Sequence, residues 1–236
     1  MAHAKRYLEL KDLHGWYGES HVLHGVNLHV DEGEVVTLLG RNGAGRTSTL
    51  RAIMGLIGSR KGSIQVHGTE TIAMATHRIA RLGLGYCPEE RGIFSSLSCE
   101  ENLMLPPQLG DGGMSLDQIY AMFPNLKERA ASQGTRLSGG EQQMLAVARI
   151  LRTGARLLLL DEMSEGLAPV IVAKLAEMVR TLRSAGYTIV MVEQNFRFAA
   201  PLADRFLVME HGQVIQEFSQ AELPARMSDL HEYLGV

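Results

Sequence analysis

A glycine-rich stretch, Leu38 to Leu50, has the residue types and spacing of a phosphate-binding loop. It follows the pattern G-x-x-x-x-G-K-[ST] from Gly40 to Thr47, with Arg46 in place of the lysine. Glycines let successive backbone N–H groups turn toward phosphate oxygens, and the N-terminus of the helix that follows adds partial positive charge. The hydroxyl of Thr47 is placed to reach Mg²⁺. The nucleotide-binding residues expected from this loop are Gly40, Arg41, Asn42, Gly43, Ala44, Gly45, Arg46, Thr47 and Ser48.

Arg46 keeps the positive charge of the lysine position but changes its shape. A guanidinium is a planar fork that prefers bidentate contacts, whereas a lysine is a point charge on a flexible stem. We therefore expect nucleotide binding to survive with an altered phosphate geometry. A glycine-rich turn that holds no ligand is the alternative interpretation of the loop.

Two adjacent carboxylates, Asp161 and Glu162, end the apolar run "RLLLLDE". A buried strand of this kind ends at the carboxyl edge of a parallel sheet, where α/β proteins bind their ligands. We expect Asp161 to hold Mg²⁺, directly or through water, and Glu162 to polarise an attacking water molecule. The alternative is that both acids are solvated loop residues.

The segment "LSGGEQQ", residues 137–143, predicts the start of a helix. Ser138 and Glu141 have the S-x-x-E spacing of a capping box. Gly139 and Gly140 leave the N–H groups of that helix start uncovered by side chains, so it forms a second surface suited to phosphate.

Strand and helix patterns alternate through the chain and must position these residues. The runs Val35 to Leu39 and Leu157 to Leu160 are apolar without alternation, which favours central strands covered on both faces. Helices are expected after the glycine loop to about Gly58, from Ser138 to Gly154, and from about Pro169 to Arg183. This alternation predicts a three-layer α/β domain with a mainly parallel sheet.

The chain of 236 residues is long enough for one domain, which we assign to residues 1–236. The segment from about 78 to 136 contains "PPQLGDGG" and little strand signal. We expect this segment to be an inserted helical subdomain.

Composition excludes several classes of protein. The net charge of -3 and the scattered basic residues give no basic stripe, so we do not expect nucleic acid as a partner. Cys87 and Cys99 form no C-x-x-C pair, which favours a reduced compartment. Neither a signal peptide nor a transmembrane run is evident, so any action at a membrane requires a partner. His21, His24 and His29 lie close together but fit no standard zinc pattern, and we expect no metal there.

The glycine loop, together with "LSGGEQQ" placed shortly before "LLLLDE", resembles the ATP-binding subunit of ABC transporters over essentially the whole chain. The resemblance implies the P-loop NTPase fold with an N-terminal antiparallel β part, and ATP and Mg²⁺ as ligands. It also implies a dimer in which the glycine loop of one subunit and residues 138–143 of the other enclose ATP. Ser138, Gly139, Gly140 and Glu141 are then nucleotide-binding residues, and closure of the dimer drives a membrane partner.

Two further motifs are assigned by their positions in the family. Tyr17, in "WYGESHVL", resembles the aromatic residue that stacks on adenine. Core packing of Tyr17 is the alternative, and Trp16 is a competing candidate. "SEGLAP", residues 164–169, resembles the loop that contacts the second subunit, with a plain turn into a helix as the alternative.

Two positions depart from the general family pattern. Glu89, in "YCPEERGIF", stands where most members have glutamine, and it either reaches Mg²⁺ or is solvated. Gln194, in "VMVEQNF", stands where most members have a histidine, and it can donate a hydrogen bond to the γ-phosphate but cannot carry a proton. With "EGLAP" and the ending "LHEYLGV", these residues resemble the LivF-type branch. Within that branch Glu89 and Gln194 are expected, and Arg46 is the remaining departure.

The resemblance implies an ATP-hydrolysing subunit of an importer for branched-chain or other hydrophobic amino acids, or related small amides. Its partners would be transmembrane permease subunits, a second ATPase chain of the same or a related kind, and indirectly a solute-binding protein. It would lie peripherally at the cytoplasmic face of the inner membrane. In the expected mechanism Arg46 holds phosphate oxygens, Glu162 orients water and Gln194 contacts the γ-phosphate.

Two alternatives remain open from the sequence. One is a regulatory subunit that binds nucleotide with weak or no hydrolysis because of Arg46. The other is a soluble ABC ATPase without a transport role, but the long insertions or tandem domains of such proteins have no room in this chain. The transported solute cannot be inferred, because its recognition belongs to other subunits.

Overall fold

The structure, a computed structural model, describes residues 5–110 and 112–234. Residues 1–4, where we expected no signal peptide, and the last two residues of "LHEYLGV" lie outside the described residues. None of the helices in the described ranges combines the length and hydrophobicity that crossing a bilayer requires.

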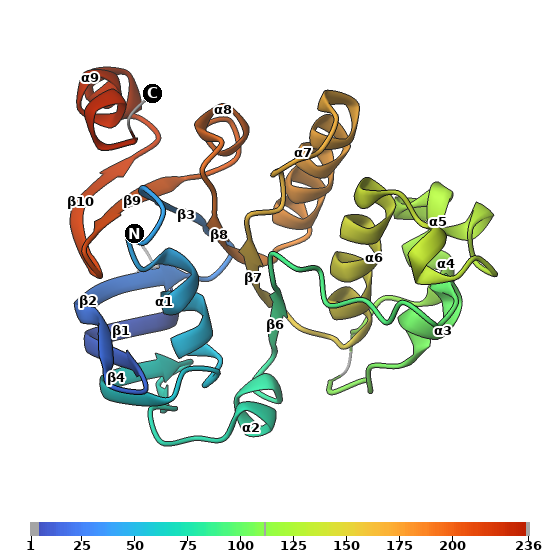
Figure 1. Ribbon diagram of the computed structural model, residues 1–236, viewed down its shortest axis with the longest axis horizontal. Helices are drawn as coiled ribbons and strands as arrows, with labels where there is room; N and C mark the ends of the chain where they lie inside the picture. The colour runs from blue at the N-terminus through green and yellow to red at the C-terminus, as the bar shows by residue number, and fades with distance from the viewer. Residues whose placement is uncertain (1–4, 111, 235–236) are drawn as a thin grey trace.

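The chain forms two sheets, and the larger one is the centre of the molecule (Figure 1). Its strand order is β10-β9-β3-β8-β7-β6, in which β9, β3, β8, β7 and β6 run parallel and β10 is antiparallel to β9. These strands are β3 (Val35–Leu39), β6 (Leu84–Cys87), β7 (Leu157–Asp161), β8 (Thr188–Val192), β9 (Arg205–Glu210) and β10 (Gln213–Ser219). The expected mainly parallel core sheet is confirmed.

The second sheet is antiparallel, in the order β2-β1-β4-β5. Its strands are β1 (Arg6–Tyr17), β2 (Ser20–Asp31), β4 (Ser59–Val66) and β5 (Thr69–Glu70). This sheet is the antiparallel β part expected near the N-terminus.

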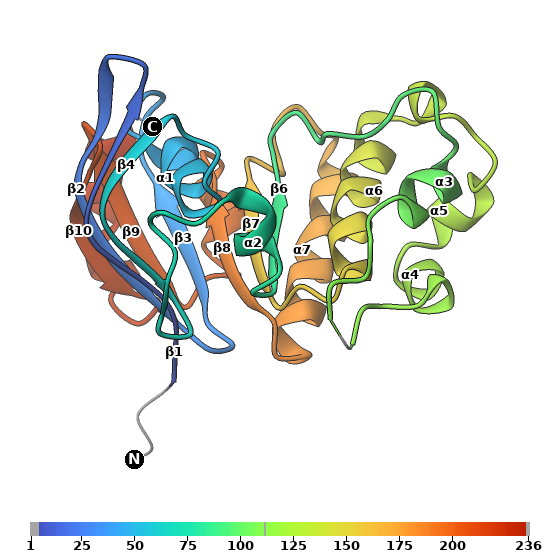
Figure 2. The same cartoon turned by 90° about the horizontal axis from the view of Figure 1, so that it is seen from below.

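The helices pack on both sides of the core sheet (Figure 2). They are α1 (Arg46–Ile53), α2 (Thr76–Ala80), α3 (Cys99–Met104), α4 (Leu116–Met122), α5 (Pro124–Glu128), the 3₁₀ turn η1 (Gly134–Arg136), α6 (Gly139–Arg152), α7 (Pro169–Ser184), α8 (Phe196–Ala199) and α9 (Leu223–Leu234). The helices expected at Ser138 and Pro169 begin as predicted. The helix after the glycine loop ends at Ile53, before the expected Gly58, and Gly55 leaves the helical region with a φ of +72°.

Alternating side chains of the central strands supply two separate cores. On β7, Leu158 and Leu160 pack in the core that contains α6 and α7, whereas Leu157 and Leu159 pack with α1 and the antiparallel sheet. Every residue of β3, β7 and β8 is buried because both faces of the sheet are covered. This arrangement confirms the three-layer α/β fold.

The segment 78–136 combines a core strand with a group of helices. Its β6 pairs in parallel with β7, so Leu84–Cys87 lies in the core sheet. Gly85 weakens the strand signal of β6, and a Cβ there would lie 3.1 Å from Cβ of Ala155. After Cys87 the helices α3, α4 and α5 pack against α6 (Figure 2). A helical subdomain built around these helices remains a prediction.

Candidate functional site

The glycine loop connects β3 to α1, and three of its residues have positive φ angles that favour glycine. Gly40, Gly43 and Gly45 have φ values of +152°, +82° and +103°. A Cβ on Gly40 would lie 2.5 Å from the backbone oxygen of Met209, so the chain cannot take this path with a larger residue there. Gly45 is the N-cap of α1 and provides no side-chain cap, which leaves the N–H groups of the helix start uncovered.

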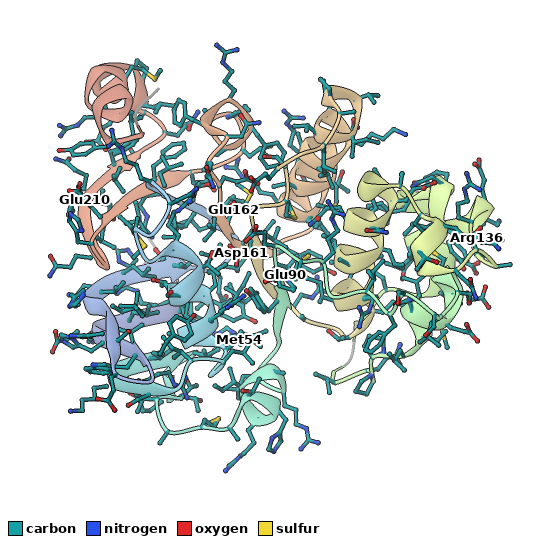
Figure 3. The ribbon with its side chains drawn as sticks, in the orientation of Figure 1. Met54, Glu90, Arg136, Asp161, Glu162 and Glu210 are labelled. Carbon is teal, nitrogen blue, oxygen red and sulfur yellow. The ribbon has the colours of Figure 1, made fainter. Side chains whose placement is uncertain are left out.

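Residues 42–48 of this loop line a cavity of about 430 Å³. The other polar groups at its wall are Glu89, Glu162, Glu165 and Gln194. Figure 3 shows Asp161 and Glu162 together at the end of β7, near the centre of the molecule. The cavity has the size of a small-molecule site, and its lining combines a helix N-terminus with carboxylates.

Thr47 and Asp161 join the glycine loop to the end of β7. Oγ1 of Thr47 donates a hydrogen bond to Oδ1 of Asp161 at 3.0 Å, and the hydroxyl of Tyr86 donates to Oδ2 at 3.0 Å. Asp161 is fully buried, and burial raises its pKa while the bonds from Thr47 and Tyr86 oppose that rise. The hydroxyl and carboxylate expected to hold Mg²⁺ therefore lie within hydrogen-bond distance of each other.

Arg46 and Glu162 form a second link between the same two segments. Nη2 of Arg46 lies 2.9 Å from Oε1 of Glu162, and the two side chains are only 4% and 8% exposed. Nε2 of Gln194 donates to both carboxylate oxygens of Glu162 at 3.1 Å and to Oδ1 of Asn42 at 2.7 Å. Four predicted site residues are thus joined in one hydrogen-bonded group.

Two features of this group suit an anionic ligand. Nη1 of Arg46 is buried and has no hydrogen-bond partner among the described residues. Its N–H groups are therefore available to donate to a ligand. Burial lowers the pKa of Arg46, and the charge of Glu162 opposes this. Glu162 itself has a φ of +45°, an uncommon angle for a residue other than glycine and one that recurs at functional sites.

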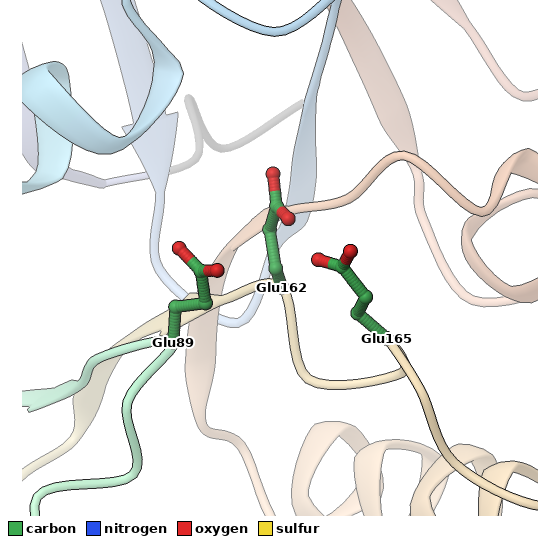
Figure 4. Close-up of side chains that lie close together, drawn as sticks. All are labelled: Glu89, Glu162 and Glu165. Carbon is green, nitrogen blue, oxygen red and sulfur yellow. The ribbon is translucent and has the colours of Figure 1, made fainter.

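Three of the glutamates that line the cavity lie close together (Figure 4). Carboxylate oxygens of Glu89, Glu162 and Glu165 lie within 4.8 Å of one another. Contact with Glu162 raises the pKa of Glu165. Carboxylate and hydroxyl oxygens are the donors that Mg²⁺ prefers, so the groups around Thr47 and Glu89 fit that ion.

Glu193, the residue before Gln194, is a buried carboxylate. Oε2 of Glu193 accepts a hydrogen bond from Oγ of Ser164 at 2.7 Å, and Oε1 accepts one from the backbone N of Ser164 at 3.2 Å. Burial raises the pKa of Glu193 to about 7, against the opposing effect of Ser164. The bond ties the loop after Glu162 to the residue that precedes Gln194.

Comparison with known proteins decides the family. Residues 23–165 match the model of the family described as ABC transporter. The chain belongs to the ABC transporter family. The high-affinity branched-chain amino acid transport ATP-binding protein BraG of Pseudomonas aeruginosa is 40% identical over 223 residues, covering 93% of this chain and 96% of BraG. The lipopolysaccharide export system ATP-binding protein LptB of Escherichia coli is 31% identical over 97% of both chains.

Solved structures agree with this ABC transporter assignment. The structure of an ATP-binding subunit of an ABC transporter superposes with a TM-score of 0.81 at 27% identity, covering 98% of this chain and 100% of that one. A dimeric bacterial ABC transporter cassette has a TM-score of 0.80 at 24% identity, covering 90% and 98%. The second likeness establishes the fold.

The segment "LSGGEQQ", residues 137–143, does not contribute to the cavity that the glycine loop lines. Ser138 caps α6, with its Oγ accepting from the N of Glu141 at 3.3 Å and Oε2 of Glu141 accepting from the N of Ser138 at 2.7 Å. A Cβ on Gly140 would lie 2.7 Å from Cγ2 of Ile171, so α6 and α7 approach closely there. Within the described part of the chain, the lining of the 430 Å³ cavity does not include Ser138, Gly139, Gly140 or Glu141.

The two aromatic candidates differ in their surroundings. Trp16 stacks on His21 with ring centroids 4.3 Å apart and has Lys61 above its ring. Tyr17 is 37% exposed, and hydrogen bonds that Arg51 on α1 donates to the oxygens of Tyr86 and Tyr17 raise the pKa of Arg51. Tyr17 is therefore the more available of the two, although it is not among the described residues that line the cavity.

The structure also identifies site residues that sequence analysis missed. Tyr86 binds Asp161, Glu165 joins the acidic group, and Glu193 binds Ser164. Glu165 follows Glu162 by three residues, so its position after β7 was a usable signal. Tyr86 and Glu193 had none, because only the pairing of β6, β7 and β8 brings them to the same sheet edge.

Proposed function

We propose that this chain is the ATP-binding and ATP-hydrolysing subunit of an ABC importer for branched-chain or other hydrophobic amino acids, or related small amides. The observation that carries this proposal is the 40% identity with BraG over nearly the full length of both proteins. The cavity with Arg46, Thr47, Asp161 and Glu162 at its wall or edge supplies the chemistry that the family requires.

Phosphate binding would rest on the glycine loop. Backbone N–H groups of Gly43 and of residues 45–48 at the start of α1 would hold β- and γ-phosphate oxygens, because no side chain caps this helix start. The N–H of Ala44 already donates to the backbone oxygen of Arg41 at 3.0 Å. Arg46 would add its partnerless Nη1 as a charged donor. Tyr17 would stack on the adenine ring.

Hydrolysis would proceed by in-line attack of water on the γ-phosphate. Glu162 would orient and polarise this water, and the Nε2 group of Gln194 would contact the γ-phosphate as a hydrogen-bond donor. The existing bonds from Arg46 and Gln194 to Glu162 hold the carboxylate in place before reaction. An amide cannot carry a proton, so Gln194 has an electrostatic and positioning role.

Mg²⁺ would be held by Thr47 and Asp161, with Glu89 within reach of the same cavity. The ion would neutralise charge on the phosphates during transfer. The role of the protein is to keep Asp161 in place, which the hydroxyl of Tyr86 does at 3.0 Å.

A second ATPase subunit, identical or related, would complete the site. Ser138, Gly139, Gly140 and Glu141 do not line the cavity of their own chain, and the start of α6, with Gly139 and Gly140 in its first turn, would face nucleotide held by the partner. The complex would include transmembrane permease subunits and work with a solute-binding protein. The chain would lie at the cytoplasmic face of the inner membrane.

The test is transport by the purified complex in proteoliposomes, with ATP supplied on the side of this subunit. We expect uptake of at least one branched-chain or hydrophobic amino acid from a panel that also includes small amides and charged amino acids. ATP hydrolysis stimulated only by an unrelated solute would contradict the proposed substrate class, but not the ATPase activity.

A regulatory role with weak hydrolysis is favoured by one observation, the ion pair of Arg46 with Glu162. A base that stays paired with a guanidinium is a poor acceptor for a proton from water. Hydrolysis by the assembled complex and its Arg46→Lys variant distinguishes this role from the one proposed above.

A further inference from the structure

The hairpin formed by β1 and β2 brings three histidines together on its surface. Nδ1 of His14 lies 3.1 Å from Nε2 of His21. His24 is the cross-strand partner of His14, and its ring centroid lies 4.0 Å from that of His21. This group contains His14, which the sequence spacing of the other histidines did not indicate. None of the three histidines lines the cavity described above, although Val22, which follows His21, does.

An irregularity in β1 positions the first of these rings. The pairing register of β1 shifts between Leu10 and His14, and Asp12 has a φ of +47°, as expected for a bulge that redirects side chains. Oδ1 of Asp12 lies 3.2 Å from Nε2 of His14. Gly25 leaves the space for this contact, since a Cβ there would lie 3.0 Å from Oδ1 of Asp12.

The Asp12 contact determines which nitrogen of His14 faces its neighbour. The carboxylate of Asp12 accepts a hydrogen bond from Nε2–H of His14, so the lone pair of the neutral ring lies on Nδ1, opposite Nε2 of His21. A carboxylate that binds the outer nitrogen of a histidine is the usual support for a metal-binding imidazole.

The ring of His21 is held between neighbours. The ring of Trp16 stacks on that of His21, with centroids 4.3 Å apart and an angle of 10° between the planes. The ring of His24 packs against it with an angle of 53° between the planes. These contacts hold the imidazole of His21 with its Nε2 3.1 Å from Nδ1 of His14.

We propose that His14 Nδ1 and His21 Nε2 form a binding site for a divalent transition-metal ion of the Ni²⁺, Cu²⁺ or Zn²⁺ type. Two nitrogens bound at about 2.0–2.1 Å to one ion are separated by roughly 3 Å, close to the observed 3.1 Å. Asp12 orients His14, and the ring of His24 packs against that of His21. A bound ion would fasten β1 to β2 immediately before Tyr17.

The sole tryptophan of the chain, Trp16, provides a local readout because it stacks on His21. The experiment titrates Ni²⁺ into untagged full-length protein that carries His3→Gln, which removes a competing histidine near the amino terminus. We expect saturable quenching of Trp16 fluorescence at one ion per chain, reversed by a chelator. Zn²⁺ should compete for the site, whereas Mg²⁺ should not.

Variants on the hairpin separate a metal site from a simple histidine contact. His14→Gln and His21→Gln should each weaken Ni²⁺ binding by at least about tenfold, and Asp12→Asn by about tenfold through loss of the supporting carboxylate. His77→Gln, an exposed histidine on α2, is the matched control and should have no effect. ATP binding by each variant checks that the protein remains folded.

Absence of saturable quenching, or equal Ni²⁺ affinity in the parent, His14→Gln and His21→Gln proteins, would overturn the proposal. Either result would mean that the two imidazoles form a hydrogen bond and do not bind a metal ion. Neither result affects the proposed ATPase function, because that function does not use His14 or His21.

Discussion

Nη2 of Arg46 donates a hydrogen bond to Oε1 of Glu162 at 2.9 Å, which joins the glycine loop to the acid that follows β7. The residue at the usual lysine position therefore contacts the proposed water-orienting carboxylate directly. Gln194 also donates to this carboxylate, so hydrogen bonds connect three residues that are distant in the sequence. The contact therefore predicts that the residue at position 46 influences the rate of ATP hydrolysis.

Arg46→Lys should leave an active ATPase. Lysine keeps the positive charge near Glu162 and the phosphates but loses the planar guanidinium, which can bind two acceptors at once. We therefore expect turnover within about tenfold of the parent. Steady-state phosphate release by the assembled complex measures this. A parent complex without hydrolysis that gains it through Arg46→Lys would instead establish the regulatory role.

Ser138→Ala should lower turnover in the assembled complex by about tenfold or more, because a contact to nucleotide held by the partner is lost. The matched control is Ser115→Ala on α4, since Ser115 and Gln118 form a capping box of the same kind. Each substitution removes a helix cap and costs about 1 kcal/mol of stability. Equal turnover in the two variants would show that Ser138 serves only as a cap.

Glu193 should make stability depend on pH. The pKa of its carboxyl is raised from 4.5 to about 7 in the folded chain, so the folded state binds more protons than the unfolded state between these values. The free energy of unfolding contributed by this group is fully present below pH 4.5 and is lost as pH rises through about 7. The loss amounts to about 3 kcal/mol.

Glu193→Gln removes this ionisation while retaining hydrogen bonds to Ser164, whose hydroxyl can both donate and accept. Denaturant unfolding of the parent and the variant at several pH values tests the assignment. We expect the difference in their free energies of unfolding to change between pH 4.5 and 7 in favour of the variant. A constant difference across that range would contradict a raised pKa.

Local patterns were sufficient to predict the parts of the site that depend on short segments. The glycine loop, the capped start of α6 and the two acids at the end of β7 each combine a motif with a neighbouring strand or helix, and each forms as expected. The apolar runs of β3 and β7 indicated burial on both faces because they lack alternation. The family resemblance supplied the expected fold and the partner subunit.

Contacts between distant segments could not be predicted in the same way. Tyr86 reaches Asp161 only because β6 pairs with β7, and Gly85 makes that strand hard to recognise. His14 meets His21 through a bulge in β1, and a bulge shifts the register in a way that residue spacing does not indicate. Both relations depend on how strands pair, which the residue spacing within one strand does not indicate.

The most direct test of the account is the Glu162→Gln substitution, measured for both MgATP binding and hydrolysis in the assembled complex. Glutamine keeps the size and polarity of the side chain but cannot accept a proton from water. We expect nucleotide to remain bound while turnover falls by about 10²-fold or more. Near-normal turnover would contradict the role of Glu162, and loss of MgATP binding from the parent complex would contradict the nucleotide site itself.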